Sequence, residues 1–261
     1  MVLDTVEKFS VAAKGKIDFL NSSFIKYFIL SMMAGAYVGF GIMLIFIIGA
    51  PFKEIGSSAT KALMGASFGI ALTLVIFAGS ELFTGNNMVM TIGSLDKKTS
   101  WMDAIKIWVV SYVGNLAGSL MLALLISLSG IIVKNPANTF ITTSATLKMN
   151  APFSELLFRG ILCNMLVCLA VWCSARVKED TAKLVLIFWC LFGFIGSGLE
   201  HSVANMTLLG MSLFIPHDPN VSWMGMVNNL IPVTIGNFIG GAIFIGAAYW
   251  FVASASKKQI N

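Results

Sequence analysis

Long apolar stretches recur along the chain, separated by short polar segments. Six of them are long enough to supply the roughly 20 helical residues that cross a hydrocarbon core about 30 Å thick. They cover residues 27–49, 62–80, 107–133, 154–175, 184–214 and 229–253, and the first three carry no charge. This pattern predicts an all-α membrane protein with six transmembrane helices.

The fifth stretch is interrupted near its middle. Residues 184–196 would form about 20 Å of helix and residues 203–214 about 18 Å, so neither part crosses the membrane alone. Between them lie Gly196, Gly198, Glu200, His201 and Ser202. Free backbone groups and ionisable side chains cannot face lipid without partners. We therefore expect a broken helix whose gap is enclosed by protein.

Two short motifs recur in the same order in both halves of the chain. G-N-x-x-G occurs at 114–118 and 236–240. The second motif, a glutamate followed after three residues by a small residue and then an asparagine, occurs at 81–86 and 200–205. Two matches at nearly the same offset favour an internal duplication. With three crossings in each half, the second repeat must be inverted, as in many channels and transporters. The duplication also predicts a break in the second helix at 80–85, followed by a short half-helix to about Gly93.

These elements divide a single channel domain over residues 1–261. We expect an N-terminal surface helix at 1–24, a first repeat at 25–133, a connecting loop at 134–152 and a second repeat at 153–261. The N-terminal helix has an apolar face, which would lie either on the membrane surface or on the protein's own underside. Both alternatives remain open. That face comprises Val2, Val6, Phe9, Ala13, Ile17 and Leu20.

Composition and charge agree with a chain surrounded by lipid. Hydrophobic residues make up 57% of the chain and charged residues 11%, against about 25% charged in a globular protein. A soluble enzyme and a nucleic-acid-binding protein are thereby excluded. If both ends lie on one side, 12 of the 17 Lys and Arg residues lie there too, which places both termini in the cytoplasm and the protein in the cell membrane. The cysteines lack metal-site spacing, so we expect neither a metal nor a cofactor.

At the repeated motifs the chain resembles the formate/nitrite transporter family, and in general character its hydrosulfide channels. The resemblance covers nearly the whole chain and is most specific at residues 34–39, 81–86 and 200–206. It implies an aquaporin-like fold with helices 2 and 5 broken. It also implies a homopentamer with one pore in each protomer. We expect the glycines of the third and sixth helices to support packing between subunits, namely Gly114, Gly118, Gly236, Gly240 and Gly241.

The resemblance also assigns roles to individual residues. It implies a central pore pair of Thr84 and His201, with Asn205 one turn beyond the histidine and Lys148 raising the potential near the centre. It further implies hydrophobic constrictions at Leu82 and Phe194 on one side of the pair and at Phe68 and Leu72 on the other. From the residues themselves, a carboxylate or amide at a helix break is typical of a structural cap. That reading applies to Glu81, Glu200 and Asn86.

Together these features favour a channel for small monovalent anions of the formate, nitrite or hydrosulfide type. The N-terminal ends of two half-helices bring partial positive charge to the membrane midplane, which favours an anion. His201 is the intramembrane group with an ordinary pKa near 6.5, so we also expect it to lend a proton to the anion. A neutral-solute facilitator of the water or glycerol type is an alternative, although His201 and the presence of a single N-P-A tripeptide, at 135–137, argue against it. A proton-coupled secondary transporter is the other alternative.

Overall fold

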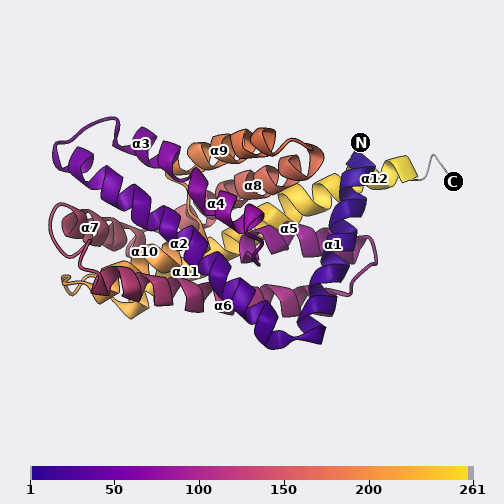
Figure 1. Ribbon diagram of the computed structural model, residues 1–261, viewed down its shortest axis with the longest axis horizontal. Helices are drawn as coiled ribbons and strands as arrows, with labels where there is room; N and C mark the ends of the chain where they lie inside the picture. Colours follow the sequence, from indigo (N-terminus) through magenta and orange to yellow (C-terminus); the bar gives the residue numbers. More distant parts are fainter. Residues whose placement is uncertain (1, 258–261) are drawn as a thin grey trace.

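The computed structural model describes residues 2–257, and all its regular elements in that range are helices (Figure 1). The π-helix η1 continues α11 without interruption, and α12 continues η1. In chain order the elements are α1 (Val2–Ser22), α2 (Phe24–Glu54), α3 (Thr60–Ser67), α4 (Gly69–Phe77), α5 (Phe83–Leu95), α6 (Trp101–Leu128), α7 (Ala137–Met149), α8 (Phe153–Arg176), α9 (Asp180–Gly196), α10 (Ser202–Phe214), α11 (Trp223–Phe238), η1 (Ile239–Ala247) and α12 (Ala248–Lys257).

Five helical segments in the described range are long and apolar enough to cross a membrane. They are α2, the α3–α4 pair, α6, α8 and the run from α11 into α12. The predicted fifth crossing is divided between α9, with 17 residues, and α10, with 13 residues. The all-helical class and the series of apolar helices are confirmed.

Helix α7 occupies the segment that we expected to be a connecting loop, so that prediction was wrong. Its residues repeat an apolar position every four residues, and these side chains are buried along one face: Ala137, Ile141, Ala145 and Met149. Polar threonines between those positions made the segment look like a loop. The helix packs against α2, α10 and α11.

Helix α1 packs on the protein itself, which decides between the two alternatives left open by the sequence. Val6, Ala13 and Ile17 are at most 3% exposed, and the helix contacts α5 and α12. The Phe9 ring stacks on Trp172 of α8 at 5.6 Å between centroids, and Trp172 stacks on Tyr249 of α12 at 4.0 Å. The aromatic stack joins α1, α8 and α12 at one end of the molecule, where Figure 1 shows α1 and α12 side by side.

The glycines of α6 and of the last helical run lie at helix crossings within the chain, so the expected role in subunit packing was wrong. A Cβ added to Gly118 would overlap the Met32 carbonyl of α2, and one added to Gly236 would overlap the Leu157 carbonyl of α8. Gly114, Gly240 and Gly241 face α2 or α8 in the same way. Without side chains there, each pair of helices approaches to backbone contact.

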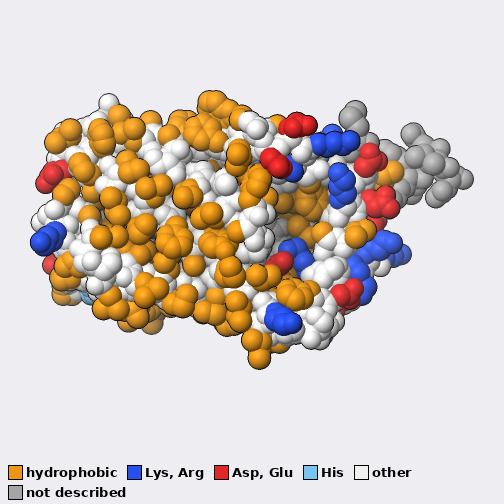
Figure 2. Space-filling view, in the orientation of Figure 1, with side chains coloured by type: hydrophobic (Ala, Val, Ile, Leu, Met, Phe, Trp, Pro, Cys, Tyr) orange, Lys and Arg blue, Asp and Glu red, His pale blue; other side chains and the backbone are white. Residues whose placement is uncertain are grey.

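The surface is divided as membrane insertion requires. In Figure 2, hydrophobic side chains cover the middle of the molecule, and most Lys, Arg, Asp and Glu side chains gather at the end that carries α1. A smaller group of charges lies at the opposite end, near α7 and the α2–α3 connection. An apolar band between two charged ends fits a bilayer.

Replacing Gly118 by Ala should force α2 and α6 apart, because the added methyl group has no space beside Met32. Overpacking of this kind typically lowers the free energy of unfolding by about 1–3 kcal/mol. Gly15 of α1 has no atom within 4 Å of a Cβ position, so Gly15→Ala is the matched control. Thermal unfolding in detergent should give a lower midpoint for Gly118→Ala than for Gly15→Ala, and equal midpoints would contradict the close crossing.

Candidate functional site

Two interruptions between helices meet near the middle of the molecule and have the same local geometry. Gly79 precedes one interruption with φ of 74°, and Gly198 precedes the other with φ of 73°. This left-handed conformation favours glycine, because a Cβ would clash with the backbone. The chain then becomes extended at Leu82 and at His201, and α5 and α10 begin at the next residue.

Two asparagines hold the interruptions in place through equivalent hydrogen bonds. The Asn115 amide donates to the carbonyls of Ser31 (2.7 Å) and Glu81 (2.9 Å), and its oxygen accepts from the backbone N–H of Phe83 (2.9 Å). Asn237 repeats this pattern in the second half. Its amide donates to Gly160 and Glu200, and its oxygen accepts from the N–H of Ser202. These asparagines belong to the repeated G-N-x-x-G motif, which sequence reasoning used only as a sign of duplication.

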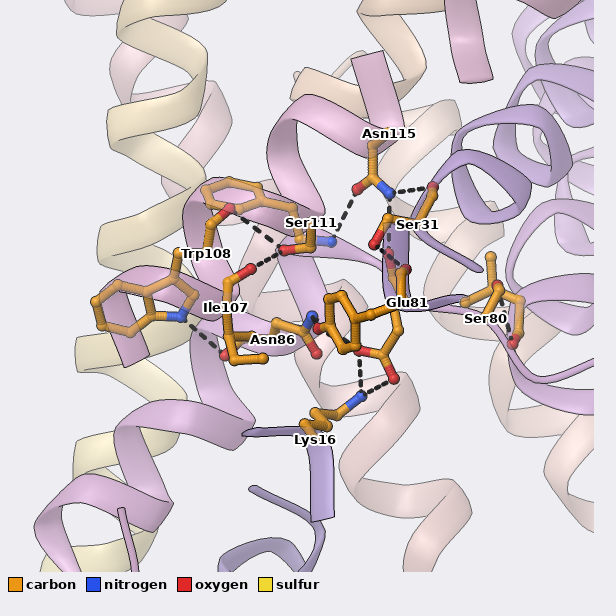
Figure 3. A network of polar contacts seen from close by, with 12 residues as sticks. Lys16, Ser31, Ser80, Glu81, Asn86, Ile107, Trp108, Ser111 and Asn115 are labelled. Carbon is orange, nitrogen blue, oxygen red and sulfur yellow. Dashed lines mark hydrogen bonds and ion pairs between the residues drawn. The ribbon is translucent and has the colours of Figure 1, made fainter. Parts of the chain in front are cut away.

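Glu81 is the centre of a polar network that joins α1, α2 and α5 (Figure 3). Both of its oxygens accept from the Lys16 ammonium at 2.7 Å, and one also accepts from the Tyr27 hydroxyl at 2.8 Å and from the Asn86 amide at 3.1 Å. Sequence reasoning missed Lys16 and Tyr27, since neither lies near a recognised motif.

Glu200 has an equivalent network on the other side. The Lys148 ammonium donates to one carboxylate oxygen at 2.6 Å, and the Asn205 amide donates to the other at 2.6 Å. Asn205 also donates to Asn229, whose own amide donates to the Lys148 carbonyl at 3.0 Å. The four residues form a closed ring that includes the backbone carbonyl of Lys148, and the Lys148 charge is balanced by the Glu200 carboxylate.

The expected capping of α5 and α10 by Glu81, Glu200 and Asn86 was wrong. Their carboxylates and amides bind lysines and one another, while asparagines of α6 and α11 bind the first backbone N–H groups. The cap of α10 comes from His201, whose Nδ1 accepts from the Ala204 N–H at 3.1 Å.

His201 and Thr84 contact each other across the two interruptions, with 3.0 Å between Nε2 and Oγ1. Because Nδ1 accepts a hydrogen bond, the proton of the neutral ring lies on Nε2, which donates to Thr84. The Thr84 hydroxyl keeps its own proton to donate elsewhere. Thr84 is 0% exposed and His201 4% exposed, so the pair, with the Thr84 hydroxyl as its free donor, is buried.

A cavity of about 750 Å³ leads from the end that carries α7 to His201. Phe194, Lys148 and Asn205 line it, as do Lys53 and Glu54 at the end of α2 and Lys61 at the start of α3. A small pocket of about 10 Å³, enough for about one water molecule, lies next to it. His201 and Phe194 border both spaces.

The hydrophobic constriction residues gather around this small pocket, which is lined by Leu82, Phe194, Phe68 and Leu72. The Phe68 and Phe194 rings meet edge to face at 5.3 Å between centroids. We expected the two pairs on opposite sides of the Thr84–His201 contact, and that arrangement was wrong. The two breaks bring α3–α4 and α9 together, so their aromatic rings close one apolar cluster.

Replacing Lys148 by Met should destabilise the protein, because the Glu200 side chain is only 4% exposed and would lose its positive partner. Removing one member of a buried ion pair typically costs about 3–5 kcal/mol. Adding Glu200→Gln to Lys148→Met should recover part of this loss. Thermal unfolding of the single and double variants measures the difference, and an unchanged midpoint for Lys148→Met would contradict the coupling.

Comparison with known proteins gives a consistent result. A model of the formate/nitrite transporter family matches residues 3–251. The chain is 43% identical to the nitrite transporter NirC of Salmonella typhimurium, over 99% of this chain and 94% of that protein. A solved FNT family ion channel matches with a TM-score of 0.90 at 43% identity, covering 95% of this chain and 98% of that one. A pentameric formate channel with formate bound matches with a TM-score of 0.76 at 28% identity, covering 89% and 98%. The protein is therefore a multi-pass membrane protein that belongs to the formate/nitrite transporter family.

Proposed function

We propose that this protein is a channel for small monovalent anions of the formate, nitrite or hydrosulfide type. The observation that carries the proposal is the contact between Thr84 and His201: His201 lines the large cavity, and its Nε2 donates to the buried Thr84 hydroxyl, which keeps its own proton to donate. The relatives include a protein described as a nitrite transporter and a channel with formate bound, which supports this substrate class.

The surroundings of the pair favour a single negative charge. Helices α5 and α10 both begin at the breaks, and the N-terminus of a helix carries about half a positive charge. The two nearby carboxylates, Glu81 and Glu200, are each paired with a lysine. An anion that reaches Thr84 therefore meets donors and helix ends rather than unpaired carboxylates.

His201 serves in this proposal as a hydrogen-bond donor rather than as a proton source. Its Nδ1 caps α10, and losing the Nε2 proton from the neutral ring would leave a highly unfavourable imidazolate anion. Proton lending would first require protonation of Nδ1, which breaks the hydrogen bond from Ala204. This geometry favours a channel over the proton-coupled transporter.

The architecture that we propose for this function is six crossings in two inverted repeats, at 25–133 and 153–261. The equivalent contacts of Asn115 and Asn237 support it. The bias of basic residues supports cytoplasmic termini in the cell membrane.

We also propose a homopentamer, because the Thr84–His201 pair of one chain already joins both halves of a pore and because a relative is described as pentameric. Cross-linking in mild detergent should give a ladder that ends at five subunits. A ladder ending at two or four would contradict the pentamer.

Flux from liposomes tests the function through two histidine variants. The wild type should release formate, nitrite and hydrosulfide. His201→Asn keeps a side chain that can cap α10, but this side chain is too short to reach Thr84. His201→Gln has a longer side chain whose amide extends toward Thr84. Losing a hydrogen bond to a charged ligand costs about 1.5–3 kcal/mol, so His201→Asn should lower flux about 10–100-fold and His201→Gln by less.

The pH profile of the same variants separates the two roles of His201. A neutral donor does not titrate, so between about pH 5 and 8 the wild type and His201→Gln should have parallel profiles. If flux changes with pH in the wild type but not in His201→Gln, His201 lends a proton to the anion and the donor-only role is wrong. Equal flux in all three proteins at every pH would remove His201 from the pathway.

Shortening both Leu82 and Phe194 to Ala should raise flux and admit larger anions. These side chains are 5% and 2% exposed and border the small pocket, where an ion loses hydration at a cost of several kcal/mol. Leu162→Ala, which changes a 52% exposed side chain, is the control. The measurement is efflux of formate and of longer carboxylates. If the double variant has the wild-type flux and size limit, these residues serve only in packing.

A further inference from the structure

The large cavity has an unequal distribution of charge along its wall. Four charged side chains line it: Lys53, Glu54, Lys61 and Lys148. Lys148 is balanced by Glu200 at 2.6 Å and therefore contributes little net charge to the space in front of it. Lys53 and Glu54 are adjacent in sequence at the end of α2 and largely cancel each other at a distance.

Lys61 is the cationic side chain of this cavity that has no balancing group close to it. No ion pair joins Lys61 to a carboxylate among residues 2–257, whereas Lys148 has one. Lys61 lies in the first turn of α3, where it is exposed to the cavity. The positive potential of the cavity should therefore depend on Lys61 more than on Lys148.

The position of Lys61 connects this charge to the helix break. Its ammonium lies 3.8 Å from the point where a side chain would begin on Gly198. Gly198 has no side chain; it lies two residues after the end of α9 and precedes His201 by three residues. The ammonium thus lies beside the break, with no side chain of residue 198 in front of it.

We propose that Lys61 is the residue that captures anions in the large cavity and delivers them to the Thr84–His201 pair. The proposal rests on the proposed function of an anion channel and adds a specific residue to it. A single exposed ammonium attracts an anion without burying it, so the anion is concentrated near the break and remains free to move on. The attraction acts on encounter and depends on salt, because the Debye length falls from about 30 Å at 0.01 M to about 3 Å at 1 M.

Flux measurements test the consequence for transport. At low ionic strength, Lys61→Met should raise the formate concentration that gives half-maximal flux about 3–10-fold and leave the maximal flux nearly unchanged. Lys61→Glu should raise it further, and Lys61→Arg should resemble the wild type. Adding an impermeant salt should bring the variants toward the wild type. Lys98→Met, which removes the same charge outside the cavity lining, is the control and should have no effect.

A second experiment measures the electrostatic potential of the cavity and does not depend on transport. Thr143 of α7 is exposed and lines the cavity, so Thr143→Cys introduces a thiol there. The same protein without this substitution gives the background labelling of the native cysteines. The probes are one anionic and one neutral methanethiosulfonate reagent. Lys61→Met should lower the ratio of anionic to neutral labelling rates about 3–10-fold at low ionic strength, and Lys98→Met should leave it unchanged.

The two measurements separate failure of this proposal from failure of the proposed function. If Lys61→Met changes neither the labelling ratio nor the half-maximal concentration, Lys61 does not capture anions, whatever the wild type transports. If the labelling ratio falls while the wild type releases no anion from liposomes, the charge of Lys61 is confirmed and the channel function is wrong.

Discussion

The structure depends on satisfying backbone groups where two helices stop inside the apolar part of the molecule. An unpaired N–H or C=O costs several kcal/mol in a medium without water, so a break survives only where protein supplies the partners. Asn115 and Asn237 supply them. Each side chain binds the carbonyl of the glutamate at the break, a carbonyl of a neighbouring helix and the first N–H of the next helix. The glycine crossings of α6 with α2 and of α11 with α8 bring these asparagines close enough to do so.

The glutamates complete this arrangement by fixing surrounding helices to the breaks. Glu81 binds α1 through an ion pair with Lys16, and Glu200 binds α7 through an ion pair with Lys148. Both helices lie outside the predicted crossings, yet each places a lysine beside a break. The carboxylates beside the two breaks are thus each balanced by a lysine, and within the described part of the chain the unpaired positive charge of the large cavity is that of Lys61.

The sequence allowed prediction of the coarse structure because crossing helices need long apolar stretches, which are visible without any tertiary information. It also located the breaks, since Glu200 and His201 in an apolar stretch require enclosure. The contacts of the break residues could not be predicted. Whether Asn86 caps a helix or binds Glu81 depends on Tyr27 and Lys16, which the fold brings from elsewhere in the chain. The same limit explains α7 and the single aromatic cluster: short spacing patterns do not reveal which distant helix a residue will face.

The double role of His201 sets how the site can respond to an ion. Its Nδ1 caps α10, so the ring cannot rotate to follow a passing anion without releasing the start of that helix. The donor direction of Nε2 is therefore fixed, and little reorganisation of the protein accompanies each passage. A rigid donor discriminates by how close an ion can come rather than by adapting to it. Small ions with a compact negative end therefore approach it best.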